Sequence, residues 1–231
     1  MSGEALADLL DILQPLKQPL VCPASGDSPA GLYRALIRRN TETRLPVSDW
    51  SFVGLDEWAG MNEKDPGSCR NHLNNDLFQP LNVQEDKICF FNGRASDLDQ
   101  ECQRIEQFID GHGGIDLTIL GLGMNGHVGM NEPFTAAASR SHVTDIDQET
   151  QRVGQKYFTS PQSLEKGLTL GMATILSSRH IFLVVSGQKK AAIVKKILQE
   201  EISEALPASL LRRHQQVTLY LDADAAKLIG P

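Results

Sequence analysis

Cysteine motifs and long apolar runs are missing from this sequence. Its four cysteines, Cys22, Cys69, Cys89 and Cys102, form no CxxC pair and no zinc-ribbon spacing. The run of apolar residues at 181–185 stops after five, far short of the roughly 18 residues that a membrane span needs. We therefore expect reduced thiols, no bound metal and no membrane partner.

Positive charge is also scarce. The chain has 22 Lys and Arg residues against 29 Asp and Glu, which gives a formal net charge of -7. This balance speaks against a nucleic-acid binder, and any anionic ligand has to be held by a few placed cations. Glu4, Asp8 and Asp11 interrupt the apolar periodicity of the first segment, which does not fit a signal peptide. We expect a cytoplasmic protein.

Composition and length are those of one packed domain. The 231 residues are 41% apolar and 22% charged, close to the globular average. No internal repeat, low-complexity tract or Gly/Ser linker marks a boundary. We expect residues 1–231 to form a single domain around a buried core.

Short β-rich runs alternate with segments of helical period along the chain. This order predicts an α/β fold, Rossmann-like, with a mostly parallel open sheet and helices on both of its faces. Ser28 followed by Pro29 predicts a helix that starts at 29 with Ser28 as its cap. We expect strands at 19–22, 50–55, 88–91, 115–121, 181–186 and 217–221. Further helices are expected around 6–13 and at 70–78, 97–109, 191–200 and 223–228.

The loop after the first strand has the composition of a phosphate site. Ser25, Gly26, Asp27 and Ser28 run into a helix start, where backbone N–H groups and the helix dipole favour an anion. An ordinary strand-to-helix turn needs the same small residues, and Asp27 speaks against an anion unless it points away. Taken alone, the loop favours the ordinary turn.

Charged residues follow two other strands. Asp56 and Glu57 come directly after an apolar run, and a buried carboxylate there has its pKa raised toward that of a general base; a capping acid is the alternative. Lys189 and Lys190 lie at a helix start, where an anionic ligand would offset their unfavourable interaction with the helix dipole. Two solvated surface lysines are the alternative there.

The glycine-rich loop after the fourth strand carries a histidine and a glutamate five residues apart, His127 and Glu132. Three of its glycines match the GxGxxG pattern of dinucleotide sites. We reject that interpretation, because the pattern needs a helix where this sequence is a poor helix former. We interpret the two residues as an acid–base pair in which the carboxylate orients the imidazole. A structural turn histidine is the alternative.

Five segments occur together: LDEW at 55–58, GLGMNGHVGMNEP at 121–133, GLTLGMATIL at 167–176, SGQKKA at 186–191 and PASLLRRH at 207–214. In order and spacing they resemble the glucosamine-6-phosphate and galactosamine-6-phosphate deaminase/isomerase family, from about residue 20 to 221. The sister 6-phosphogluconolactonases differ after the histidine, where this chain has NEP. LDEW, PGSC at 66–69, GLGMNGHVGMNEP and LPAS are most similar to the galactosamine-6-phosphate branch.

The resemblance implies an isomerisation coupled to deamination that needs no cofactor. It converts galactosamine 6-phosphate, or glucosamine 6-phosphate, to tagatose or fructose 6-phosphate and ammonia, with hydrolysis of an imine as the last step. By this resemblance His127 opens the pyranose ring, and Asp56 moves the C2 proton to C1 through an enolamine. Glu132 matches the family's acidic partner of the histidine, and Asn125 belongs to the same catalytic group.

The resemblance also assigns contacts with the substrate. Glu57, next to the expected base, is expected to bind substrate. Lys156 stands where many members have an arginine that contacts the phosphate, and it keeps the charge without the bidentate fork. A compensating contact or weaker phosphate binding is therefore expected. The remaining matches are Ser25, Gly26, Asp27 and Ser28 with the phosphate loop and Lys190 with the phosphate-binding lysine.

Three departures from the family pattern carry expectations of their own. Asn125 takes the place of an aspartate of the glucosamine branch, which removes one charge that would stabilise the imidazolium of His127. His142 and Thr144 fall where the allosteric hexameric members carry basic residues, so we expect no allosteric site and a monomer or small homo-oligomer. The chain also starts in its first helix, without the family's leading strand.

Two other functions fit part of the pattern. A lactonase of the 6-phosphogluconolactonase type would use His127 as a base for water but has no evident use for Glu132. A non-catalytic sugar-phosphate regulator would keep the phosphate loop and could dispense with Asp56. The deaminase needs all of these residues, and for that reason we favour it.

Overall fold

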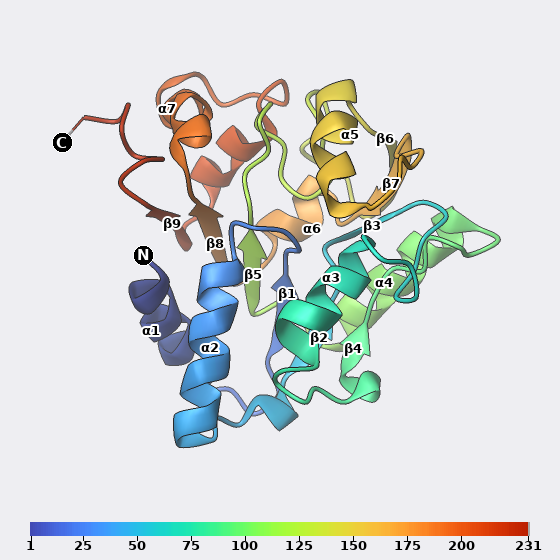
Figure 1. Ribbon diagram of the computed structural model, residues 1–231, viewed down its shortest axis with the longest axis vertical. Helices are drawn as coiled ribbons and strands as arrows, with labels where there is room; N and C mark the ends of the chain where they lie inside the picture. The colour runs from blue at the N-terminus through green and yellow to red at the C-terminus, as the bar shows by residue number, and fades with distance from the viewer. Residues whose placement is uncertain (231) are drawn as a thin grey trace.

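The computed structural model describes residues 1–230, and these are built around one six-stranded sheet (Figure 1). All neighbouring strands are parallel, in the order β4-β2-β1-β5-β8-β9. The mostly parallel sheet expected from the sequence is confirmed. Its strands are β1 (Leu20–Pro23), β2 (Ser51–Val53), β4 (Ile88–Cys89), β5 (Leu117–Leu120), β8 (His180–Val185) and β9 (Val217–Leu221).

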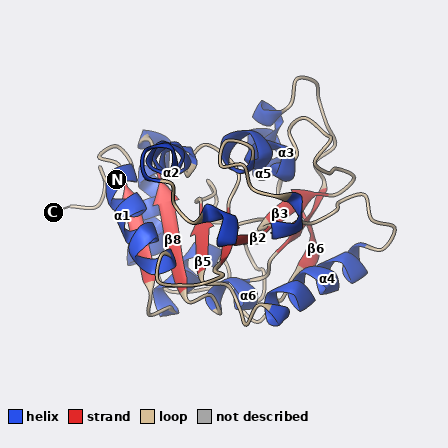
Figure 2. Cartoon of the chain, turned by 90° about the horizontal axis from the view of Figure 1, so that it is seen from below, coloured by secondary structure: helices blue, strands red, loops and turns tan. Residues whose placement is uncertain are grey.

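Helices cover both faces of this sheet (Figure 2). One face packs against α1 (Ser2–Leu13), α2 (Ala30–Thr43) and α3 (Cys69–Leu73). The other packs against α4 (Leu98–Gly111), α6 (Met172–Leu176) and α7 (Ala191–Gln199). The remaining helical segments are α5 (Gln148–Gly154), η1 (Val47–Asp49), η2 (Asn74–Phe78), η3 (Glu85–Lys87), η4 (Gln155–Tyr157), η5 (Gln188–Lys190) and η6 (Pro207–Arg213).

Successive strand residues face two different cores. In β8, Ile181, Leu183 and Val185 pack toward α4, α6 and α7. Phe182 and Val184 pack toward α1 and α2, as the two-residue period of a strand requires. Because both faces are covered, the strands are continuous apolar runs, and this made them recognisable in the sequence.

A second, smaller sheet was not predicted. It is antiparallel, in the order β3-β7-β6, and consists of β3 (Asp56–Trp58), β7 (Lys166–Thr169) and β6 (His142–Asp145). The expected strand at 50–55 is divided: β2 ends at Val53, and the Leu55 carbonyl already accepts the backbone N–H of Leu170. Asp56 therefore belongs to the second sheet, where it pairs with Thr169.

Three helix predictions need correction. The helix expected at 223–228 is wrong: these residues form turns, and the Asp222 carboxylate accepts the backbone N–H groups of Gly187 and Ala225. Ser28 does not cap α2, which begins at Ala30 without a side-chain cap. The helix expected at 70–78 is α-helical only as far as α3 and continues as the π-helical turn η2.

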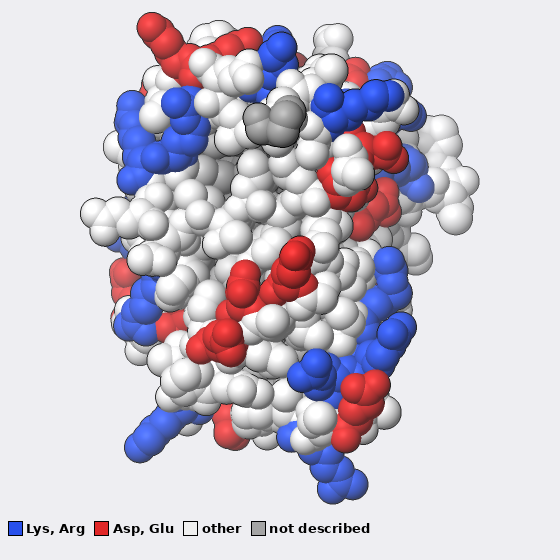
Figure 3. Space-filling view, turned by 90° about the vertical axis from the view of Figure 1, so that its left-hand side faces the viewer, with Lys and Arg blue, Asp and Glu red and all other residues white. Residues whose placement is uncertain are grey.

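Surface charge is divided into small groups. On the face that lies at the left of Figure 1, acidic side chains gather near the middle, and Lys and Arg lie toward the rim (Figure 3). This face has no continuous basic stripe of the kind that holds a nucleic-acid backbone. Within residues 1–230, no helix combines the length and apolar character needed to cross a bilayer.

Candidate active site

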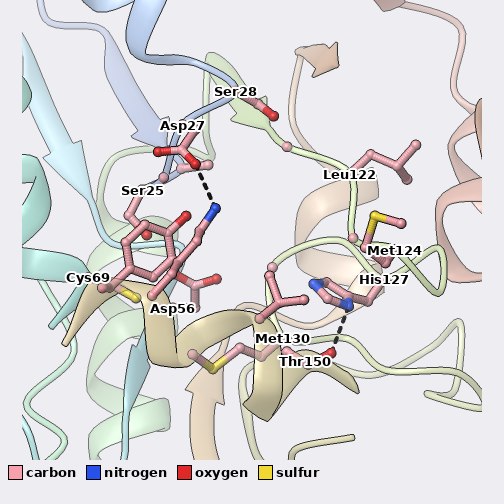
Figure 4. A pocket seen from close by; sticks show the side chains of 18 of the residues that line it. Ser25, Asp27, Ser28, Asp56, Cys69, Leu122, Met124, His127, Met130 and Thr150 are labelled. Atoms are coloured by element: carbon pink, nitrogen blue, oxygen red, sulfur yellow. Dashed lines mark hydrogen bonds and ion pairs between the residues drawn. The ribbon is translucent and has the colours of Figure 1, made fainter. Parts of the chain in front are cut away.

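A cavity of about 910 Å³ lies among the loops that follow four strands of the fold (Figure 4). The loops after β1, β5 and β8 lie at the carboxyl ends of parallel strands, where ligands bind, and the loop after β3 joins them from the second sheet. The segment α5–η4 adds a further wall. Its lining includes Ser25, Gly26, Asp27, Ser28, Asp56, Cys69, His72, His127, Thr150, Lys156, Tyr157 and Lys190.

Asp56 is a buried carboxylate at this cavity. Asp56 is the first residue of β3, and it is 9% exposed. Burial raises the pKa of Asp56 to about 6, because desolvation penalises the charged form. The neighbouring Cys69 side chain and the charge of His127 act in the opposite direction and lower it. A carboxyl that exchanges its proton near pH 6 is suited to act as a general base.

His127 is held in one orientation by the loop that carries it. The Asn125 side-chain oxygen accepts the His127 backbone N–H at 3.1 Å and lies 2.7 Å from Nδ1. The Asn125 amide nitrogen donates to Glu132 Oε2 at 2.7 Å. This bond fixes which way the amide points, so Nδ1 must carry the proton that reaches Asn125. Nε2 of the neutral ring is then the acceptor, and it faces the cavity (Figure 4).

Glycine makes room for this arrangement at one position. A Cβ at Gly123 would lie 2.3 Å from the His127 ring, so any side chain there would displace the imidazole. Thr150, from α5, approaches the ring from the other side with its hydroxyl 3.2 Å from Nδ1. The imidazole is thus positioned by residues from two separate segments.

Asn125 and Glu132 lie behind His127 and do not line the cavity. Glu132 Oε2 is 3.5 Å from His127 Nδ1. Burial acts to raise the pKa of Glu132, but hydrogen bonds from His127, Thr150 and Asn125 and the charge of His127 outweigh it and leave the pKa lowered. Both residues were expected to be catalytic. Their contacts give them a positioning role that acts through His127.

The phosphate loop forms the other end of the cavity. Gly26 has a φ of +99°, and a Cβ there would lie 2.9 Å from the Tyr157 hydroxyl. Both the backbone conformation and the contact therefore favour glycine. Ser25 and Ser28 line the cavity on either side of it (Figure 4). Ser28 is thus available to a ligand, since it caps no helix.

Two lysines approach this loop. Lys156 Nζ lies 2.6 Å from Asp27 Oδ2 and 4.7 Å from the centre of the Tyr157 ring. The Asp27 carboxylate is therefore turned to a cation, which answers the objection that it would repel an anion. Lys190 Nζ donates to the Leu122 carbonyl. Burial, with a smaller contribution from Lys156, lowers the pKa of Lys190 to about 8.

Glu57 is not where the sequence led us to expect it. Its side chain is fully buried and does not line the cavity. Oε1 accepts the backbone N–H groups of Trp58 and Cys69 at 2.9 Å, and Oε2 accepts that of Arg70 at 3.0 Å. Successive strand residues point to opposite sides, so Glu57 points away from the cavity that Asp56 faces. It ties α3 to β3 and does not line the cavity.

Sequence reasoning missed several cavity residues. Cys69 was noticed only as part of PGSC, and Tyr157 follows the predicted Lys156 directly. His72 and Thr150 lie on helices, α3 and α5, that come from outside the main sheet. The rule that inspects loops after parallel strands does not reach them. Among the described residues, His, Cys, Asp and Glu side chains form no group of three or more that could hold a metal ion.

Comparisons with known proteins agree with this architecture. The family model "Glucosamine-6-phosphate isomerases/6-phosphogluconolactonase" matches residues 7–220. The chain is 42% identical over 206 residues to glucosamine-6-phosphate deaminase 1 of Bacillus subtilis, covering 89% of this chain and 85% of that protein. It is 37% identical over 227 residues to glucosamine-6-phosphate deaminase of Bacillus velezensis, covering 98% and 94%.

Solved structures give the same grouping. A monomeric glucosamine-6-phosphate deaminase superposes with a TM-score of 0.94 at 39% identity, covering 98% of this chain and 95% of the other. The 6-phosphogluconolactonase of Thermotoga maritima has a TM-score of 0.76 at 19% identity, with 95% and 92% covered, and shares the fold alone. Since both the sequence match and the superposition extend over nearly the whole length, the chain belongs to the glucosamine-6-phosphate isomerase/6-phosphogluconolactonase family.

Proposed function

We propose that this chain is an amino-sugar 6-phosphate deaminase/isomerase that produces a ketose 6-phosphate and ammonia. The observation that carries the proposal is one cavity that holds Asp56 and His127 together with Lys156 and Lys190. The two lysines supply positive charge for a phosphate, and the other two residues supply groups for proton transfer. No cofactor takes part in the proposed reaction.

The proposed reaction begins with ring opening. The imidazole of His127 takes the proton of the C1 hydroxyl and returns one to the ring oxygen, so the C1–O5 bond breaks and C1 becomes an aldehyde. Glu132 and Asn125 keep Nδ1 protonated and leave Nε2 for this transfer. A neutral imidazole is suited to both directions of transfer near neutral pH.

Proton transfer between carbons follows. Asp56 removes the proton from C2 while the aldehyde oxygen gains one from the substrate's ammonium group at C2, which gives an enolamine. The same carboxyl then delivers its proton to C1, leaving an imine at C2. Water adds to that imine, and the C2–N bond breaks to release ammonia and the ketose. The raised pKa of Asp56, about 6, suits a group that takes up and returns one proton.

The phosphate is proposed to bind at the loop of Ser25, Gly26 and Ser28, with Lys156 and Lys190 as its cations. Tyr157 is placed to supply the compensating contact that Lys156 needs in place of an arginine fork, since its hydroxyl is close to Gly26. The charge of Asp27 is already directed to Lys156. An acidic chain can thus accept an anionic substrate at this end of the cavity.

We propose glucosamine 6-phosphate as the preferred substrate. The relatives reported above are named for it, whereas LDEW, PGSC and LPAS favoured galactosamine 6-phosphate, its C4 epimer. We also propose a monomer, because the relative with a TM-score of 0.94 is described as monomeric.

The test is an ammonia-release assay with both amino sugars, combined with acid release from 6-phosphogluconolactone. We expect ammonia from glucosamine 6-phosphate at a higher kcat/KM than from its epimer. Ammonia from neither amino sugar refutes the proposal, and acid from the lactone instead supports the hydrolase. Size-exclusion chromatography with light scattering tests the monomer.

A further inference from the structure

His72 lines the cavity but has no part in the reaction proposed above. It belongs to α3, and its side chain is partly exposed. Its ring forms a T-shaped pair with the ring of Tyr157, from η4, and the two ring centroids are 5.3 Å apart. The pair joins two segments that lie outside the main sheet. Tyr157 is the residue proposed above to contact the phosphate, so what holds its ring bears on phosphate binding.

A carboxylate holds the imidazole of His72 on its own side. Nε2 of His72 lies 3.0 Å from Asp76 Oδ2, four residues further along the chain. An ionised carboxylate only accepts hydrogen bonds, so Nε2 carries the proton of this contact. One ring nitrogen is therefore occupied by Asp76, and the ring itself packs against Tyr157.

The backbone around α3 fixes the position of His72. Glu57 accepts the backbone N–H groups of the first two residues of α3, which ties this helix to β3. The backbone N–H of His72 donates to the Ser68 carbonyl at 3.0 Å. Just before α3, Gly67 comes so close to η4 that a Cβ there would lie 2.9 Å from the Tyr157 carbonyl oxygen. The start of α3 and the turn that carries Tyr157 are therefore in direct contact.

The phenol of Tyr157 also reaches the phosphate loop. A Cβ at Gly26 would lie 2.9 Å from its hydroxyl oxygen, and Lys156 Nζ lies 4.7 Å from the centre of its ring. The same side chain thus contacts the imidazole of His72 and approaches the loop where the phosphate is proposed to bind. A T-shaped aromatic pair contributes more than the area that it buries, so this contact restricts the phenol more than an aliphatic one would.

We propose that His72 is a positioning residue for phosphate binding: its imidazole, held by Asp76, packs against Tyr157 and keeps the phenol hydroxyl directed at the phosphate loop. The inference rests on the proposed function, because it concerns the phosphate site of that reaction. A role through Tyr157 needs an aromatic ring at position 72, whereas a direct contact with the phosphate needs the imidazole. The two roles therefore differ in the result that they predict for His72→Phe.

Calorimetry with glucitol 6-phosphate, an open-chain ester that has no amine to lose, measures this role without turnover. In His72→Ala we expect Kd to rise about two- to tenfold, the range of one aromatic pair. The KM for glucosamine 6-phosphate rises by the same factor, and kcat is nearly unchanged. In His72→Phe we expect most of the affinity to return, because the ring that packs against Tyr157 is kept.

His112→Ala is the matched control for losing a histidine that packs against an aromatic ring. The rings of His112 and Phe108 have centroids 4.2 Å apart, and neither residue lines the cavity. We expect this variant to bind the ester as the wild type does. An unchanged Kd in His72→Ala overturns the inference, and so does an equal loss in His112→Ala. A loss in His72→Phe as large as in His72→Ala also overturns it, because the imidazole itself would then contact the phosphate.

Fluorine NMR without ligand separates the inference from the proposed function. The chain has three tyrosines, so labelling with 3-fluorotyrosine leaves few signals, and Tyr157→Phe assigns the relevant one. We expect this signal to shift in His72→Ala and to return toward its wild-type position in His72→Phe. An unchanged signal in His72→Ala overturns the inference even where the ester binds. If the wild type neither binds the ester nor releases ammonia, the proposed function fails, and the fluorine signal alone decides whether His72 positions the phenol. His72→Leu replaces the alanine variant if circular dichroism shows that the latter is unfolded.

Discussion

Two buried carboxylates of the candidate active site, Asp56 at the cavity and Glu132 behind His127, respond differently to burial. The pKa of Asp56 is raised to about 6, and that of Glu132 is lowered. Burial is the largest influence on Asp56, whereas Glu132 accepts the side-chain amide of Asn125 and lies 3.5 Å from His127 Nδ1. The same chemical group is thereby prepared to exchange a proton in one place and to stay ionised in the other.

A third buried carboxylate, Glu57, shows which neighbouring groups decide whether burial raises or lowers the pKa. Glu57 accepts three backbone N–H groups, yet burial raises its pKa to about 7 and the charge of Asp56 adds to the effect. Hydrogen-bond donors alone therefore do not offset desolvation here. Glu132 differs in its partners, because its side-chain contacts with His127, Thr150 and Asn125, together with the charge that a protonated His127 carries, outweigh burial.

The largest expected effect comes from removing the Asp56 carboxylate. Asp56→Asn keeps the shape of the side chain but cannot accept the C2 proton, so we expect kcat to fall by about a thousandfold. Binding of a phosphate ester, measured by calorimetry, changes little, because Lys156 and Lys190 are untouched. A variant that keeps a tenth of the wild-type kcat would show that another group is the base.

Lys190→Met gives the next largest effect, and it acts on binding. The change removes a cation at nearly constant length, so we expect KM to rise about 10- to 100-fold, the range of one charge-assisted hydrogen bond, with kcat nearly unchanged. The pKa of Lys190 is lowered to about 8, so the cation is lost as pH rises through this value. Wild-type KM should therefore rise above pH 8, and that of Lys190→Met should not. A parallel rise in both would assign the effect to another group.

The sequence predicted those parts of the molecule that depend on local patterns. The parallel strands were recognisable because apolar runs such as β8 are buried on both faces. Asp56, His127 and Lys190 were found because they follow such strands. The phosphate loop follows β1 in the same way, although Ser25 and Ser28 taken alone also fit an ordinary strand-to-helix turn.

The remaining parts depend on contacts between distant segments. The prediction placed Glu57 at the cavity because it did not foresee that β2 ends before Asp56 and that Asp56 begins a new strand. That new strand, β3, forms by pairing with β7, and the pairing decides which side chain faces the cavity. Tyr157 reaches Gly26 across more than half the chain. The strand β3 has three residues, too few to show a period of its own. No local pattern encodes these contacts.

Thermal stability sharpens the contrast between the two carboxylates. A raised folded-state pKa means that the stability from protonated Asp56 is fully present below the usual pKa of 3.8 and is lost as pH rises to about 6. We expect Asp56→Asn to raise Tm at pH 8 by a few degrees, on the scale of about 2–4 °C per kcal/mol, and by a smaller amount at pH 5. Glu132 has a lowered pKa, so its charge stabilises the fold at pH 8 and this contribution is lost in acid. Glu132→Gln therefore lowers Tm at pH 8. Shifts of equal sign would contradict the contrast.

The smallest expected effect comes from Asn125→Asp, which places a second carboxylate beside Glu132. The new carboxylate replaces an oxygen 2.7 Å from His127 Nδ1 and an amide nitrogen 2.7 Å from Glu132 Oε2. Its charge stabilises the imidazolium, and its contact with Glu132 favours a shared proton. Both effects hold protons at higher pH, so the acid limb of kcat/KM should move upward by less than about one pH unit. The profile over pH 5 to 9 measures this shift, with Asn92→Asp, at an exposed site away from the cavity, as the control for added charge. An unchanged profile would show that Asn125 orients the imidazole without influencing its charge.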